Sequence, residues 1–110
     1  MPHIIVEYSQ NLQGELDVPA LLMCLHETLA AGGIDKARIK TRAIVCEAVV
    51  GEKGLGGKMA HATLLLLEGR DIPTKKQYGD ALHAVLKNAV PEGCAATLEI
   101  RDMVKDTYYL

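Results

Sequence analysis

Pro2 has the residue type and the position of an N-terminal general base. Once Met1 is removed, the proline ring holds a secondary amine at the start of the chain, whereas an attached Met1 leaves that nitrogen as an amide. An α-amino group has a pKa of about 8, and burial or nearby cations lower it further. A general base works best when its pKa is close to the ambient pH, so a proline at the second position predicts a catalytic Pro2. A Met-Pro start also occurs in proteins without any such role.

Positively charged side chains follow at a spacing that suits one face of a strand. Arg38, Lys40 and Arg42 alternate with other residues, and period 2 places alternate side chains on the same face. Arg70 adds a cation just after Gly69, where the next strand is expected to end. Guanidinium groups bind carboxylates in a bidentate way and stabilise negative charge on an enolate oxygen. The alternative is a solvated, charged edge that discourages sheet aggregation.

The four histidines show no metal-ligand spacing, and no metal is expected. His3 follows Pro2 directly and is a candidate substrate contact. His61 lies in the middle of an expected strand, where a structural role is more common than a functional one. His26 and His83 fall on expected helices and are interpreted as surface or packing residues.

The three cysteines, Cys24, Cys46 and Cys94, are widely spaced and form no Cys-x-x-Cys pair. An odd number of such cysteines is typical of a reducing compartment and argues against disulfides or a structural zinc site. We therefore expect ordinary, mostly buried thiols.

Composition excludes several classes of function. Twelve basic and 14 acidic residues give a net charge of −2, and there is no Trp or Phe, so a nucleic-acid surface is not expected. The longest apolar run, 62–67, is far too short for a membrane span. No signal peptide is apparent at the N-terminus, which favours a cytoplasmic protein with an aliphatic core.

Two similar halves, about 1–52 and 53–110, are expected to position these residues within one domain of 110 residues. Each half reads as strand, helix, strand, with Asp17 as an N-cap and glycines after the first helix. The expected elements are strands at 3–8, 38–50, 58–68 and 97–103, helices at 18–31 and 74–90, and a turn at 51–57.

A β-α-β unit joins its strands by a right-handed crossover, so the strands within each half should be parallel. We therefore predict an α+β fold, in which two tandem β-α-β units form a four-stranded mixed sheet with both helices on one face. The other face needs cover, which symmetric association of identical sheets would supply.

Several segments resemble 5-carboxymethyl-2-hydroxymuconate isomerases of the tautomerase superfamily. They are Met-Pro-His-Ile-Ile-Val-Glu-Tyr-Ser at 1–9, Ile-Lys-Thr-Arg at 39–42, His-Ala-Thr-Leu at 61–64 and Gly-Arg at 69–70. The resemblance runs through essentially the whole chain, although the last strand and the tail match only loosely.

This resemblance implies a homotrimer and a cofactor-independent isomerase of aromatic degradation through homoprotocatechuate. Pro2 would move a proton within an unsaturated 2-hydroxy acid, and Arg42 and Arg70 would bind carboxylates and polarise the 2-oxo group. The family commonly has arginine where this chain has Lys40, and lysine lacks the planar fork. Arg38, on the same expected face, would compensate.

Two other functions stay open at this point. Relatives in the superfamily use the N-terminal proline for hydration, dehalogenation or decarboxylation of small unsaturated acids. A trimeric binding protein without catalysis would also fit the residue Lys40 and the absence of a second clear catalytic group.

Overall fold

The computed structural model describes residues 1–110 and contains four strands and two long helices. In chain order they are β1 (His3–Ser9), α1 (Val18–Ala31), β2 (Lys40–Cys46), β3 (Met59–Leu67), α2 (Ile72–Ala89) and β4 (Ala95–Met103). The strand–helix–strand order predicted for each half is therefore observed.

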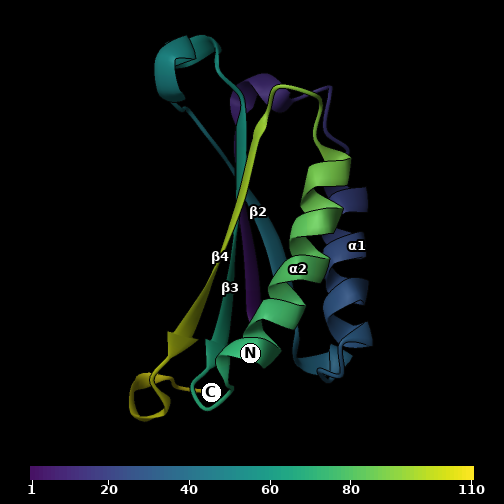
Figure 1. Cartoon of the computed structure of the whole chain (residues 1–110), viewed down its shortest axis with the longest axis vertical. Coiled ribbons are helices and arrows are strands. Elements are labelled where there is room, and N and C mark those ends of the chain that lie inside the picture. The colour runs from purple at the N-terminus through teal and green to yellow at the C-terminus, as the bar shows by residue number, and fades with distance from the viewer.

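The strands form one mixed sheet in the order β2-β1-β3-β4. β1 runs parallel to β2 and antiparallel to β3, and β3 runs parallel to β4. Figure 1 shows both helices side by side on one face of this sheet, while the opposite face carries no helix. The predicted fold class is confirmed.

Alternation along the central strands separates the two faces of the sheet. Ile4 and Val6 in β1, and Leu64 and Leu66 in β3, are fully buried beneath the helices. Burying such side chains contributes about 1.5–3 kcal/mol each. The core is aliphatic apart from Tyr8, as the composition predicts.

Both helices begin at an aspartate that caps the first turn. The Asp17 carboxylate accepts a hydrogen bond from the backbone N–H of Ala20, and that of Asp71 accepts one from Thr74. This capping satisfies an N–H that has no partner within the helix. Because Asp71 is the cap, α2 starts at Ile72, two residues earlier than predicted.

The predicted strand at 38–50 is too long at both ends. Arg38 belongs to a 3-10 turn (Lys36–Arg38) that Asp35 caps, so it does not continue the alternation of Lys40 and Arg42. Residues 47–50 leave the sheet and lead to a 3-10 segment at Gly51–Gly56. There Gly54 has φ of +59°, a conformation that favours glycine. β4 also starts earlier than predicted, at Ala95.

The expectation of mostly buried cysteines is wrong. Cys24 is exposed on α1, and Cys46 and Cys94 are only half-buried; all three are free thiols. Neither helix is long and apolar enough to cross a bilayer.

Candidate active site

Pro2 lies at the end of the sheet where β1 begins, near several positively charged side chains. In the sheet, His3 is paired with Lys40 of β2 on one side and with Leu65 of β3 on the other. Pro2 itself is buried, and its carbonyl oxygen accepts a hydrogen bond of 3.0 Å from the Lys40 backbone N–H. Both chain termini lie at this end of the molecule (Figure 1).

An amine at this end of β1 is disfavoured as a cation. Burial lowers the pKa of the Met1 amino group, and a hydrogen bond from Lys40 and the charges of Lys40 and Arg38 lower it further. Arg38 therefore lies near the N-terminus, although it is outside β2 and forms a salt bridge with Asp35 at 3.7 Å. The prediction that Arg38 shares a strand face with Lys40 and Arg42 is therefore wrong, because Arg38 lies in the 3-10 turn before β2.

His3 connects Arg42 to the C-terminal tail. An Arg42 guanidinium nitrogen lies 3.0 Å from His3 Nδ1, and the Tyr108 hydroxyl lies 2.8 Å from His3 Nε2. Arginine can only donate, so Nδ1 must accept, and a neutral ring then carries its proton on Nε2 and donates it to Tyr108. This assignment follows from the hydrogen-bond partners.

The same surroundings keep His3 neutral. Burial lowers the pKa of His3, and the positive charges of Arg42, the N-terminus and Lys40 lower it further. No carboxylate takes part in these contacts.

Arg70 lies at the same end of the sheet but does not contact the other predicted residues. It follows β3 after Gly69, whose φ is +122°, and it donates to the Leu67 carbonyl at 3.5 Å. Since β3 runs antiparallel to β1, Leu67 lies level with the chain start.

The two arginines assigned to catalysis from the sequence form no ion pair. Of the four arginines, Arg38 and Arg101 are bound by carboxylates, whereas Arg42 and Arg70 are not. Lys40 also has no carboxylate partner and donates instead to the Arg38 carbonyl at 3.3 Å. Uncompensated positive charge beside an apolar surface attracts anions.

Tyr108 is the residue of this region that the sequence did not reveal. It is separated from His3 by 105 positions and lies in the tail beyond β4. Residues 104–110 contain polar and aromatic residues, but this composition does not predict that the tail contacts β1.

The other histidines make structural contacts, as expected. The His26 ring is 2.8 Å from the Thr41 hydroxyl, that of His61 is 2.7 Å from Thr97, and that of His83 is 2.9 Å from a backbone carbonyl oxygen. No group of three or more His, Cys, Asp or Glu side chains is arranged to hold a metal ion.

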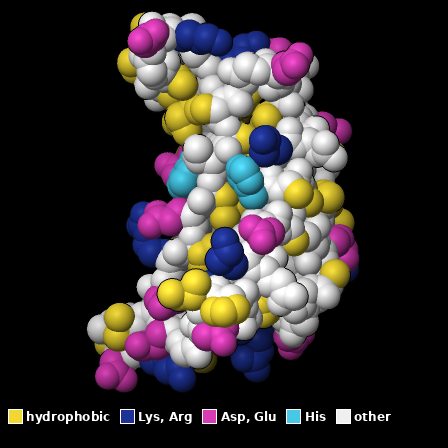
Figure 2. Space-filling model, viewed as in Figure 1, with side chains coloured by type: hydrophobic (Ala, Val, Ile, Leu, Met, Phe, Trp, Pro, Cys, Tyr) yellow, Lys and Arg dark blue, Asp and Glu magenta, His cyan; other side chains and the backbone are white.

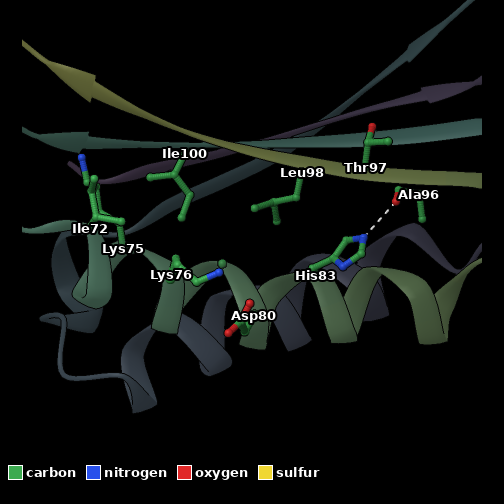
Figure 3. Close-up of a pocket in the computed structure, with 10 residues that line it drawn as sticks. Ile72, Lys75, Lys76, Asp80, His83, Ala96, Thr97, Leu98 and Ile100 are labelled. Atoms are coloured by element: carbon green, nitrogen blue, oxygen red, sulfur yellow. Dashed lines mark hydrogen bonds between the residues drawn. The ribbon is translucent and has the colours of Figure 1, made fainter.

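A groove of about 670 Å³ lies elsewhere, between α2 and β4. Figure 3 shows Leu98 and Ile100 pointing from β4 toward α2, with His83 bonded to the Ala96 carbonyl. Charged, histidine and hydrophobic side chains are interspersed over this face of the molecule (Figure 2). None of the residues predicted to do chemistry lines the groove, so it is not the candidate active site.

Pro2, Arg42 and Arg70 line none of the five main hollows on the surface of the single chain. The candidate site is the end of the sheet where β1 begins, with a buried Pro2 and with cations that have no carboxylate partner. This arrangement can hold an anion beside a weakly basic amine.

Comparison with known proteins points to one family. The family model described as 5-carboxymethyl-2-hydroxymuconate isomerase matches residues 2–107. The chain is similar to the 5-carboxymethyl-2-hydroxymuconate Delta-isomerase of Escherichia coli, with 35% identity over 89 residues that span 79% of this chain and 71% of that one.

Solved structures show the same fold. The crystal structure of a 5-carboxymethyl-2-hydroxymuconate isomerase from Deinococcus radiodurans R1 has a TM-score of 0.89 and 28% identity, covering 99% of this chain and 87% of that one. A fused 4-OT protein, described as a symmetric trimer, has a TM-score of 0.75 and 20% identity over 99% of this chain and 91% of that one.

We expect His3 to titrate below its ordinary pKa of 6.5 in an NMR titration of the ring signals. At acidic pH, His3 Nδ1 is protonated and can no longer accept the hydrogen bond from Arg42. In an Arg42→Gln variant the pKa should rise toward 6.5, because the positive charge is gone. Lys58→Gln, at the opposite end of β3, should leave the titration unchanged; a wild-type pKa above 6.5 would contradict the geometry.

Proposed function

The chain belongs to the 5-carboxymethyl-2-hydroxymuconate isomerase family, a family of cofactor-independent isomerases within the tautomerase superfamily. We propose that it ketonises a 2-hydroxymuconate-type substrate. The substrate is an unsaturated di- or tricarboxylate, such as 5-carboxymethyl-2-hydroxymuconate, in cytoplasmic aromatic catabolism. The observation that carries the proposal is the cluster of Lys40, Arg42 and Arg70, none paired with a carboxylate, around the end of β1.

Pro2 is the base in this mechanism, after removal of Met1. Its amine takes the proton of the 2-hydroxyl group, and the electrons of that O–H bond form the 2-oxo group while the double bonds shift. A proton is then returned to a distal carbon, so the substrate gains and loses one proton and the amine is regenerated. The lowered pKa of the Met1 amino group shows that burial, Lys40 and Arg38 disfavour a positive charge at this end of the chain, and the same cations would favour a neutral Pro2 amine, which a base must be to accept a proton.

Arg42 and Arg70 bind the carboxylates and stabilise negative charge that develops on the 2-oxygen. Arg42 uses one guanidinium nitrogen for His3 and Arg70 uses one for the Leu67 carbonyl, so both retain further N–H donors. Lys40 contributes a point charge beside the amine. We assign secondary substrate contacts to Arg38 and His3.

The working form is a homotrimer in this proposal. The sheet face without helices exposes Ile44, half of whose surface is accessible, and Pro2 lines none of the five main hollows of a single chain. A neighbouring sheet would cover this face and complete the walls of the site. The fused 4-OT protein, described as a symmetric trimer, shares the fold.

Replacing Pro2 by Ala should lower kcat/KM for ketonisation by about 10²-fold or more, the usual contribution of general acid–base catalysis. The control is Pro73→Ala, an exposed proline in the first turn of α2, which should retain full activity. Mass spectrometry of each protein should show a chain that lacks Met1. Undiminished ketonisation in the Pro2→Ala variant would refute the proposed base.

Replacing Arg70 by Ala should lower kcat/KM by about 10- to 100-fold, as expected for the loss of charge-assisted hydrogen bonds to a carboxylate. Lys87→Ala removes an exposed cation from the last turn of α2 and serves as the control for a change of charge alone. Equal effects of the two substitutions on steady-state kinetics would argue against a direct role of Arg70.

Sedimentation equilibrium should give a mass of about three times the 11.9 kDa of one chain. Ile44→Asp places a charge on the uncovered sheet face and should reduce the mass toward that of one chain. Ile72→Asp makes the same change at an exposed position of α2 and should leave the assembly intact. A monomeric wild-type protein would contradict the trimer.

A further inference from the structure

The C-terminal tail is fixed at both ends of a short turn, which determines where Tyr108 lies. β4 ends beside β3, where the Glu68 backbone N–H donates to the Met103 carbonyl at 3.0 Å. The Glu68 carboxylate then accepts a hydrogen bond of 2.7 Å from the Lys105 backbone N–H, at the start of a 3-10 turn (Lys105–Thr107). Tyr108 follows this turn directly and is half-buried.

Tyr108 contacts His3 through its hydroxyl and through its ring. The hydroxyl is 2.8 Å from Nε2, and the two rings meet edge to face with centroids 5.9 Å apart and planes at 73°. The next residue, Tyr109, is 87% exposed, and its side chain forms no hydrogen bond. A tail that merely lay on the surface would leave both tyrosines alike, so the contact of Tyr108 is specific.

The order of donors along this chain of contacts is determined by Arg42. Its guanidinium offers only N–H groups, so His3 Nδ1 must be free of a proton to accept one of them. The neutral ring then carries its proton on Nε2, and Tyr108 accepts it. If the ring instead carried its proton on Nδ1, two N–H groups would face each other and the Arg42 contact would be lost.

We propose that Tyr108 is a positioning residue for Arg42: its hydroxyl and ring fix the orientation of the His3 imidazole, so that Nδ1 faces the guanidinium at the substrate site. The inference rests on the proposed function, since it gives Arg42 the role of binding a substrate carboxylate. Tyr108 thereby couples the C-terminal tail to substrate affinity without touching the reacting atoms.

Tyr108→Phe tests the inference, because phenylalanine keeps the ring contact and removes only the hydroxyl. We expect KM for the carboxylate substrate to rise about three- to tenfold, the usual effect of losing one hydrogen bond, while kcat changes less than twofold. Tyr109→Phe is the matched control and should change neither constant. In a His3→Ala background, Tyr108→Phe should have no further effect, because the residue it acts through is gone.

Nitrogen NMR of the His3 ring supplies a measurement that does not depend on activity. The wild-type protein should show a protonated Nε2 and an unprotonated Nδ1. Tyr108→Phe should shift the Nε2 signal, because its hydrogen bond is lost, and the Nδ1 signal, because the ring is no longer held toward Arg42. Tyr108→Phe with an altered KM but unchanged His3 signals would overturn the inference, as would a wild-type proton on Nδ1. A wild-type protein that shows the expected signals yet ketonises no substrate contradicts the proposed function alone.

Discussion

The position of β1 in the middle of the sheet is the constraint on which the candidate site depends. Because β1 is parallel to β2 and antiparallel to β3, its first residues meet the start of one neighbour and the end of the other. Only this register brings the N-terminus beside Lys40 and Arg42 on one side and beside the segment that leads to Arg70 on the other. A shift by one residue would turn His3 toward the helices and Ile4 away from them.

The core makes that register costly to change. Ile4 and Val6 are fully buried between β2 and β3 and beneath the helices, and their neighbours in β3 are buried as well. Each buried aliphatic side chain contributes about 1.5–3 kcal/mol, so moving Ile4 and Val6 to the uncovered face would cost about 3–6 kcal/mol, a large part of the roughly 5–15 kcal/mol by which a typical domain is stable. The apolar alternation of β1 thus determines the position of the polar residue between Pro2 and Ile4, which is His3.

The sequence predicted the fold well because its signals were local. Capping aspartates, alternating apolar residues and glycines after the first helix each act over a few positions, and the mixed sheet follows from two β-α-β units. Lys40 and Arg42 could be placed on one face because period 2 holds within a single strand, whereas the pairing of His3 with Lys40 depends on the register between two strands. Arg38 alternates with Lys40 and Arg42 as a strand residue would, but the Asp35 carboxylate caps the turn that contains Arg38 and keeps it out of β2. The contact of Tyr108 with His3 spans nearly the whole chain, and no local pattern could predict it.

The contacts of Lys40 fit the proposed mechanism without an arginine at this position. Its ammonium donates to the Arg38 carbonyl and lowers the pKa of the Met1 amino group, both of which a compact charge does without a planar fork. In the proposed mechanism, bidentate binding of carboxylates falls to Arg42 and Arg70, which are held by one contact each. Because Arg42 is held only through His3, carboxylate binding by Arg42 would depend on the protonation of that ring. Lys40, Arg42 and Arg70 together would supply the positive charge that a dicarboxylate needs.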